Sequence, residues 1–178
     1  MVKKSVTIFC SASDLEQKYI DLAKDISHIL CSKGYSVVFG ASDKGTMKVV
    51  AEVFEENNKD VTGITFGHLE GVARKDITKL IVAASLDDRK QELLARGNFL
   101  LALPGGVGTL DELVYAIENI KHGLYNGKLL LFNFENFFDG IKLQLSHMAN
   151  NGFVDQLILD KVIFVEDTDD FTKLIENF

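Results

Sequence analysis

A glycine-rich turn in the middle of the chain has the composition of a phosphate-binding site. The turn consists of Pro104, Gly105, Gly106, Val107, Gly108 and Thr109. Residues 99–103 before it form an unbroken apolar run, which predicts a buried strand, and Thr109 is predicted to cap the helix that follows. Glycines leave backbone N–H groups uncovered, and the N-terminus of a helix attracts anions. We expect a phosphate here; a tight strand-to-helix turn without a ligand is the other interpretation.

The acidic residue Glu112 admits two interpretations. It stands three residues after Thr109, which is the spacing of a capping box, in which the glutamate accepts a hydrogen bond from the N–H of the cap residue. A carboxylate here could instead face a ligand bound at the turn. Asp111 points in a different direction on the helix, so we expect only one of the two to face a ligand.

Two further groups of residues could hold a phosphorylated sugar. Arg89 and Lys90 lie in a charged segment at residues 87–96, where the guanidinium of arginine suits phosphate or ribose oxygens. A charged run of this kind is more often a solvated helix face. Ser11 and Ser13 follow the first predicted strand and could add hydroxyl groups, although serines also form turns at strand ends.

Strands and helices alternate along the chain. Strands are predicted at residues 6–10, 36–39, 61–66, 77–83, 99–103, 129–132 and 162–165, and helices at 15–33, 46–57, 87–96, 110–120, 137–150 and 169–177; residues 67–76 show no regular pattern. This order predicts an α/β fold of the Rossmann-like type, a doubly wound and mostly parallel sheet with helices on both faces. Ligands bind such sheets at the carboxyl ends of strands, so we expect residues 11–13, 40–45 and 104–109 to meet there.

Composition narrows the classes of function. A length of 178 residues predicts a single domain over residues 1–178, and a net charge of −7 argues against nucleic acid as a partner. No apolar run reaches the ~20 residues that span a bilayer, so no membrane partner is expected. Cys10 and Cys31 form no Cys-x-x-Cys motif and no secretory leader precedes them, which predicts a reduced, cytoplasmic location.

No metal or cofactor is expected. The histidines, His28, His68, His122 and His147, lack the spacing of metal ligands. The pattern Gly-x-Ser-x-Gly is absent, and Gly-x-Gly-x-x-Gly does not follow the first strand, which argues against a serine hydrolase and an NAD enzyme. No lysine stands out as an anchor for pyridoxal phosphate.

Three motifs together resemble one family. The strand–Pro-Gly-Gly-x-Gly-Thr-x-x-Glu–helix arrangement ending at Glu112 resembles the LOG (Lonely Guy) family, the cytokinin riboside 5′-monophosphate phosphoribohydrolases, whose members have carried the label "possible lysine decarboxylase". Residues 9–13, Phe-Cys-Ser-Ala-Ser, are similar to the family's Phe-Cys-Gly-Ser-Ser, and residues 88–93 to its Glu-Arg-Lys-x-x-Met. The resemblance extends from Val6 to Phe153.

The resemblance implies a reaction and its residues. The reaction is hydrolysis of the N-glycosidic bond of a purine nucleoside 5′-monophosphate, AMP or an N6-modified AMP, to free base and ribose 5-phosphate. Glu112 is implied as the catalytic carboxylate, Arg89 as its catalytic partner and Lys90 as a ligand contact. A homodimer is also implied, with Val114 and Tyr115 as candidates for the contact.

Two segments depart from the family pattern and leave other hypotheses open. The family's Gly-Gly-Gly-x-x-Gly-Leu-Met-Gly reads Gly-Ala-Ser-Asp-Lys-Gly-Thr-Met-Lys at residues 40–48, and its Thr-Trp-Ala-Gln-Leu-Gly reads Glu-Asn-Ile-Lys-His-Gly at 118–123. A nucleotide-binding or carrier protein without turnover is therefore the second hypothesis. A third, binding of single-stranded DNA as in distantly similar Rossmann-like proteins, fits the acidic charge least. Met47 is expected in a base pocket or, more commonly for such spacing, in the core.

Overall fold

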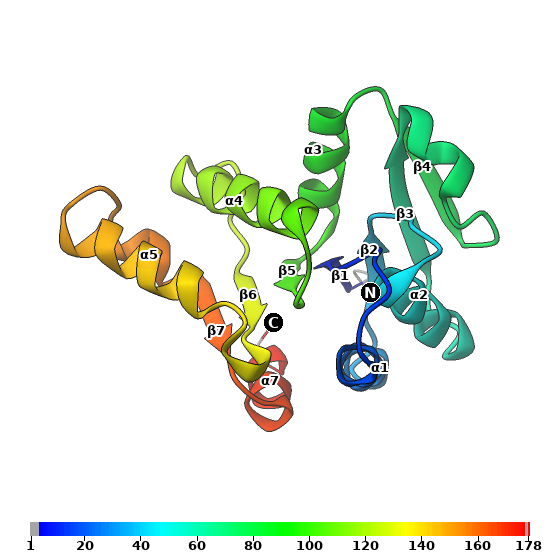
Figure 1. Ribbon diagram of the computed structural model, residues 1–178, viewed down its shortest axis with the longest axis horizontal. Coiled ribbons are helices and arrows are strands. Elements are labelled where there is room, and N and C mark those ends of the chain that lie inside the picture. The colour runs from blue at the N-terminus through cyan, green and yellow to red at the C-terminus, as the bar shows by residue number, and fades with distance from the viewer. Residues whose placement is uncertain (1–3, 177) are drawn as a thin grey trace.

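A single parallel sheet runs through the protein. The computed structural model describes residues 4–176 and 178, apart from the side chain of His68. Within these residues the strands are β1 (Ser5–Phe9), β2 (Ser36–Phe39), β3 (Val61–Phe66), β4 (Lys79–Ala83), β5 (Phe99–Ala102), β6 (Leu129–Phe132) and β7 (Val162–Val165). Their order in the sheet is β4-β3-β2-β1-β5-β6-β7, and every pair is parallel (Figure 1). The chain therefore winds outward in both directions from the β1–β5 pair.

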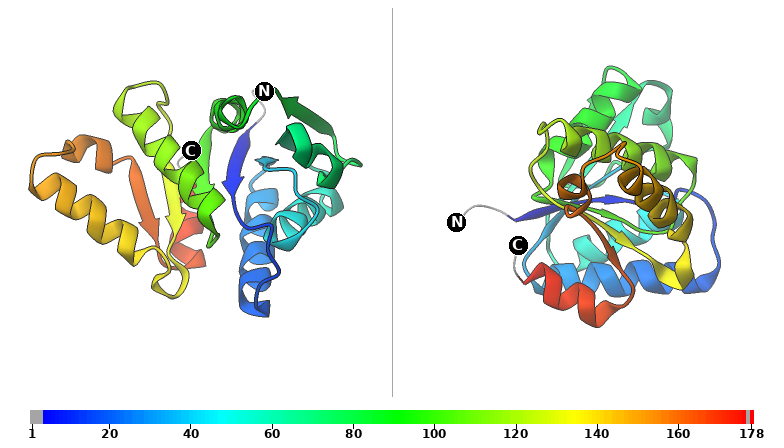
Figure 2. Two further views of the ribbon diagram at one scale, coloured as in Figure 1. Left: turned by 45° about the horizontal axis from the view of Figure 1, so that its top comes forward. Right: turned by 90° about the vertical axis from the view of Figure 1, so that its left-hand side faces the viewer.

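Helices cover both faces of the sheet. They are α1 (Gln17–Ser32), α2 (Gly45–Glu56), α3 (Leu86–Arg96), α4 (Val107–Lys121), α5 (Asp139–Asn150), α6 (Gln156–Leu159) and α7 (Thr168–Ile175), with 3-10 turns at Gly67–Val72 and Phe134–Asn136. Helices α1, α2 and α7 share one buried apolar cluster, and α3, α4 and α5 share the other (Figure 2). The doubly wound fold is thus confirmed. The short helix α6 and both 3-10 turns were not predicted, because they are too short to show a period.

The central strand β5 explains why an apolar run predicts a strand here. Phe99 and Leu101 pack into the cluster on the α1 side, and Leu100 and Ala102 into the cluster on the α4 side. A strand covered on both faces needs apolar residues at every position, because its side chains alternate between the faces. The last predicted helix ends at Asn177, which lies outside the described residues.

Helix α3 brings its residues to the middle of the sheet. It connects β4, at one edge, to the central strand β5, so it must cross the face of the sheet between them. The hydroxyl of Thr7 on β1 donates to the carbonyl of Leu93 at 2.7 Å, and the hydroxyl of Ser5 donates to the carbonyl of Arg96 at 2.6 Å. These bonds fix the second half of α3 over β1. Among the described residues, no helix is long and apolar enough to cross a membrane.

Loss of packing at β5 should be costly. Leu101 is fully buried, so Leu101→Ala is expected to lower the free energy of unfolding by ~2–5 kcal/mol through lost burial and the cavity left behind. Leu157, which is 71% exposed, provides the matched control, and Leu157→Ala should stay within about 0.5 kcal/mol of the parent. Urea denaturation measures both, and equal losses would contradict the assignment of β5 to the core.

Candidate functional site

The carboxyl ends of β1 and β5 lie side by side where the strand order changes direction. Phe9 at the end of β1 pairs with Ala102 at the end of β5, and the N–H of Leu103 donates to the carbonyl of Phe9 at 2.9 Å. A pocket of about 420 Å³ opens at this point. Its lining is Cys10, Ser11, Ala12, Ser13, Met47, Phe66, Leu69, Leu86, Arg89, Gly106, Val107, Gly108, Thr109 and Glu112. Residues that follow β1, β2 and β5 thus meet in one pocket, as expected for this fold.

Helix α4 begins earlier than the sequence predicted. Its N-cap is Gly106, and the N–H of Leu110 makes the first helical bond, to the carbonyl of Gly106, at 3.1 Å. The prediction that Thr109 caps the helix is therefore wrong. The hydroxyl of Thr109 is buried and donates to the carbonyl of Cys10 at 3.2 Å. This bond fastens the first turn of α4 to the end of β1, because the hydroxyl finds a tertiary acceptor in place of a local one.

The start of α4 also removes the capping-box interpretation of Glu112. With Gly106 as the cap, Glu112 lies more than one turn into the helix and cannot reach the N–H of the cap residue. Glu112 lines the pocket, and its carboxylate accepts a hydrogen bond from Arg89. The spacing from Thr109 resembled a cap only because the beginning of the helix was misplaced.

The glycines at the start of α4 face open space. A side chain on Gly106 or Gly108 would meet nothing within 4 Å, and neither residue has a positive φ. The turn itself therefore does not require glycine at these two positions. Gly106 offers no side chain to cap the helix, so the N–H groups of the first turn have no helical acceptor, and residues 106–109 line the pocket. Such a turn can bind an anion through its backbone and the helix dipole.

Arg89 and Glu112 form a buried ion pair in the pocket. Nη1 of Arg89 donates to Oε1 of Glu112 at 2.9 Å, and both side chains are at least nine-tenths buried. Nε of Arg89 donates to the carbonyl of Ile64 at 3.0 Å, and Nη2 donates to the carbonyl of Gly40 at 3.4 Å. Residues from β3, from the end of β2 and from α4 therefore hold the guanidinium, and each terminal nitrogen keeps a second N–H that donates to no residue in the described part of the chain. Arg89 does not belong to a solvated face.

Burial shifts the protonation of two groups in the pocket. Burial raises the pKa of Glu112 to about 7, although the charge and hydrogen bond of Arg89 act in the opposite direction. A carboxyl with this pKa can exchange a proton near neutral pH. Burial also raises the pKa of the Cys10 thiol to about 12, so Cys10 is not a thiolate nucleophile at neutral pH.

Of the other predicted binding residues, Ser11 and Ser13 line the pocket and Lys90 does not. Ser11 and Ser13 line the pocket, and the N–H of Ser13 donates to the hydroxyl of Ser11 at 3.0 Å, so these serines also form the turn that was the alternative interpretation. Lys90 does not line the pocket. Its ammonium lies 3.1 Å from Asp87 on α3 and 3.3 Å from Asp111 on α4, and its side chain is only 11% exposed. Its role as a ligand contact stays a prediction.

Sequence reasoning missed two parts of the site. The apolar wall of the pocket includes Phe66, Leu69 and Leu86, which come from a strand end, a 3-10 turn and the start of α3. No periodic signal marks such residues, because their side chains meet only in three dimensions. Gly40 was also missed as a partner of Arg89, although its position at the end of β2 was a usable signal.

Within residues 40–48, glycine is present at the two positions where a side chain would clash. Gly40 and Gly45 are the positions that need glycine: a side chain on Gly40 would overlap Arg89, and Gly45 has a φ of +59° against the carbonyls of Ser11 and Ser13. Ala41 replaces a family glycine but keeps a left-handed φ of +64°. Lys48 is exposed and lies 3.7 Å from Glu52 on the outside of α2.

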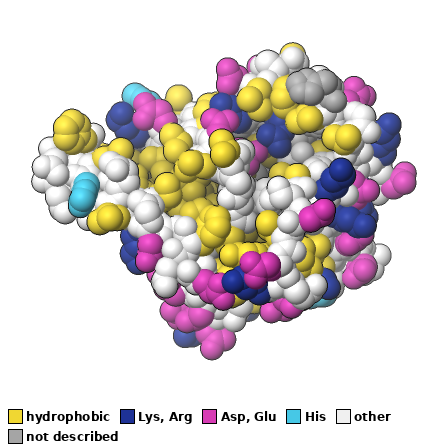
Figure 3. Space-filling model, viewed as in Figure 1, with side chains coloured by type: hydrophobic (Ala, Val, Ile, Leu, Met, Phe, Trp, Pro, Cys, Tyr) yellow, Lys and Arg dark blue, Asp and Glu magenta, His cyan; other side chains and the backbone are white. Residues whose placement is uncertain are grey.

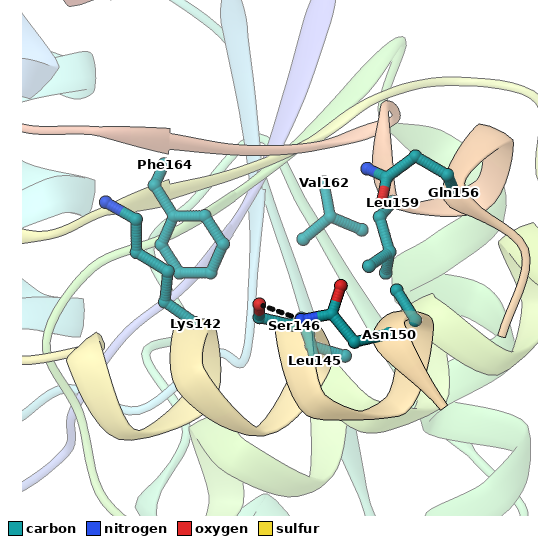
Figure 4. Close-up of a pocket in the computed structure, with 9 residues that line it drawn as sticks. Lys142, Leu145, Ser146, Asn150, Gln156, Leu159, Val162 and Phe164 are labelled. Atoms are coloured by element: carbon teal, nitrogen blue, oxygen red, sulfur yellow. Dashed lines mark hydrogen bonds between the residues drawn. The ribbon is translucent and has the colours of Figure 1, made fainter. Parts of the chain in front are cut away.

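A second hollow lies at the β7 edge of the sheet, and Lys142 is the one ionisable side chain in its lining. It lies between α5, α6 and β7 and is lined by Lys142, Leu145, Ser146, Ala149, Asn150, Gln156, Leu159, Val162 and Phe164 (Figure 4). The side chain of Asn150 donates to Ser146 at 3.4 Å, and no carboxylate is present in this lining. The pocket at the β1–β5 switch point is therefore the better candidate.

A family model matches most of the chain, including part of this pocket. The family model described as "Possible lysine decarboxylase" matches residues 47–175, a range that includes Arg89, the glycine turn and Glu112. The chain belongs to this family. The resemblance to the LOG family that the motifs carry is thereby confirmed.

Two relatives in the family carry the same name. The chain is 27% identical over 169 residues to the cytokinin riboside 5′-monophosphate phosphoribohydrolase of Mycobacterium marinum. The aligned region covers 93% of this chain and 90% of that protein. It is 28% identical over 168 residues to the protein of the same name from Rhodococcoides fascians, covering 92% and 85% of the two chains.

Among solved structures, the molybdenum cofactor binding protein from Rippkaea orientalis superposes with a TM-score of 0.73 over 99% of this chain and 98% of that one. At 17% identity, this likeness concerns the fold alone.

The position of the Arg89 side chain should depend on the absence of a side chain at Gly40. Arg89 cannot move away from a new side chain at residue 40 without losing its bonds to Ile64 or Glu112, so Gly40→Ala is expected to lower the free energy of unfolding by ~1–3 kcal/mol. Gly71→Ala is the control, because a side chain there meets nothing within 4 Å. Urea denaturation compares the two, and a Gly40→Ala loss no larger than the control would show that residue 40 does not constrain Arg89.

Proposed function

We propose that this protein hydrolyses the N-glycosidic bond of a purine nucleoside 5′-monophosphate, releasing free base and ribose 5-phosphate. The observation that carries the proposal is the buried Arg89–Glu112 pair in a pocket that ends at the open N-terminus of α4. One end of the pocket suits a phosphate and its middle suits a sugar cation. Both are parts of the same substrate.

The pocket suggests an orientation for the nucleotide. The 5′-phosphate would lie against the backbone N–H groups at Gly106–Thr109, with the hydroxyls of Ser11 and Ser13 nearby. The ribose would lie beside Glu112, and the base would lie against the apolar wall formed by Met47 and its neighbours. Met47 is 8% exposed and packs into the core as well, so it can serve both purposes.

The proposed mechanism uses Glu112 as a carboxylate. As the bond between C1′ and the base nitrogen breaks, its electron pair leaves with the base, and the sugar becomes cationic. The Glu112 carboxylate stabilises that cation or takes a proton from the water whose oxygen bonds to C1′. Arg89 holds the carboxylate in place and offers its free N–H groups to the substrate. The nitrogen of the released base takes up the proton that the water loses, so the reaction balances with water as the only other reactant.

The relatives favour a particular class of base. Those from Mycobacterium marinum and Rhodococcoides fascians are named for cytokinin riboside 5′-monophosphate, which supports AMP or an N6-modified AMP as the substrate here. The apolar side chains of Phe66, Leu69 and Leu86 are compatible with an apolar substituent on the base. The competing hypothesis is a carrier protein without turnover. Such a carrier would bind AMP and release no adenine.

A homodimer and a cytoplasmic location complete the proposal. Hydrophobic side chains gather on the face over α4 and α5 (Figure 3), and on α4 Leu110 and Val114 are 43% and 54% exposed. Contiguous exposed apolar surface is typical of protein contacts, which supports a second copy of this chain as the partner. Cys10 and Cys31 are free thiols, as a reducing compartment would keep them.

Replacement of Glu112 tests the proposal. Glu112→Gln is expected to lower the rate of adenine release from AMP by about 100- to 10,000-fold while AMP still binds, because the amide cannot carry the negative charge. The adjacent, exposed Asp111 supplies a matched control, and Asp111→Asn should retain most of the activity at pH 8. Chromatography of the free base measures the rate, and calorimetry measures binding. Wild-type protein that binds AMP and N6-substituted AMP but releases no base would overturn the hydrolase assignment.

The pH profile provides an independent test. Because the Glu112 carboxyl has a pKa raised to about 7, kcat/KM should fall as the pH drops through about 7 and protonation removes the carboxylate. The charge of Asp111 contributes to that raised pKa, so Asp111→Asn should lower the pKa and move the acidic limb to lower pH. Steady-state rates between pH 5 and 9 measure the shift. An acidic limb that stays fixed, or moves upward, would show that Glu112 does not control the profile.

A further inference from the structure

A second pocket adjoins the proposed phosphate site. It has a volume of about 280 Å³ and is lined by Ser11, Ser13, Leu15, Tyr19, Pro104, Gly105, Gly106 and Phe137. It shares Ser11, Ser13 and Gly106 with the pocket that holds Arg89 and Glu112. The two pockets therefore meet at the residues that would hold the 5′-phosphate, and the second one extends away from the ribose and base.

The second pocket has the walls of a site for a neutral, planar group. The rings of Tyr19 and Phe137 lie with their centroids 6.4 Å apart at 74°, and Leu15 and Pro104 supply further apolar surface. Its lining contains no charged side chain, and its polar side-chain groups are the hydroxyls of Ser11, Ser13 and Tyr19. Aromatic walls with few polar groups suit flat, apolar ligand groups.

The aromatic wall is held in place by its surroundings. Tyr19 packs edge-on against Phe134 at 5.9 Å, and Lys18, which lies 5.2 Å from the Tyr19 ring, is held by Glu135 at 2.6 Å. Phe137 is 44% exposed, so its ring has surface left for a ligand. A wall fixed before binding loses little entropy when it contacts a ligand.

We infer that the site accepts nucleoside 5′-phosphodiesters that carry a planar apolar group on the phosphate, and that this group occupies the pocket lined by Tyr19 and Phe137. The inference rests on the proposed function only in placing the phosphate at the start of α4. The two pockets share Ser11, Ser13 and Gly106, and Glu112 and Met47 line only the first, so a group in the second pocket would be joined to the nucleotide through its phosphate. The ligand class is thus wider than simple monophosphates.

Binding of matched esters tests the inference. AMP, its methyl ester and its phenyl ester are titrated by calorimetry into the full-length Glu112→Gln protein, so that turnover does not consume them. The two esters carry the same charge, so their comparison isolates the ring. The phenyl ester should bind at least about tenfold more tightly than the methyl ester, a difference of ~1.4 kcal/mol. Equal affinities of the two esters, with AMP still bound, would overturn this inference alone, whereas failure of AMP to bind would overturn the proposed function as well.

Variants of the second pocket locate the ring. Phe137→Ala should remove most of the preference for the phenyl ester, and Leu15→Trp should do the same by filling the pocket, while the affinity for AMP stays unchanged and shows that both variants are folded. Phe153→Ala removes an aromatic side chain that is 79% exposed and outside the pocket, so it should keep the preference. A preference that survives both pocket variants would place the ring elsewhere. A change of oligomeric state in Phe137→Ala, with no phenyl preference in the parent, would assign the pocket to a second copy of the chain and overturn the inference.

Discussion

The buried ion pair between Arg89 and Glu112 is the interaction on which the site depends. Two charges removed from water are costly unless each is paired and their remaining hydrogen-bonding groups are satisfied. Here the guanidinium also donates to the carbonyls of Ile64 and Gly40, so the pair is joined to β3 and to the end of β2. The fold must therefore deliver a carboxylate, an arginine and two strand carbonyls to one point, and the doubly wound sheet does this at its switch point.

The charge of Arg89 does not fully offset the effect of burial on the pKa of the Glu112 carboxyl. Burial keeps the pKa of Glu112 raised in spite of Arg89, so its carboxylate is close to a balance with its protonated form at neutral pH. A carboxylate in this state can respond to a developing positive charge more strongly than one exposed to water, because the low local dielectric strengthens the interaction. The same burial that makes the pair costly for stability suits the role that we propose for Glu112.

Small polar side chains set the positions of the larger elements around this pair. Thr109 fastens the start of α4 to the carbonyl of Cys10, and Thr46 accepts from the N–H of Ser11 and so holds α2 against the end of β1. Thr7 holds α3 across the sheet through the carbonyl of Leu93. Each hydroxyl links a helix to β1 or to the residues just after it. Strand β1 is therefore the common reference for the three helices that supply the pocket.

The sequence by itself determined the order of elements, the parallel sheet and the segments that form the site. Apolar runs such as residues 99–103 specify buried strands, and the glycines at 105, 106 and 108 mark a turn open to an anion. These features depend on local composition and period, which are visible along the chain. The resemblance to the LOG family likewise pointed to Arg89 and Glu112 as a set.

Only the tertiary structure decided what those residues contact. It showed that α4 begins at Val107, that Thr109 bonds to β1, and that Glu112 meets Arg89 and does not cap its own helix. It also separated Lys90, which faces Asp111, from the pocket that its neighbour Arg89 enters. The physical reason is that consecutive residues on a helix face different directions, and hydrogen-bond partners far apart in sequence compete with local ones. Which partner wins depends on distances that exist only once the sheet has formed.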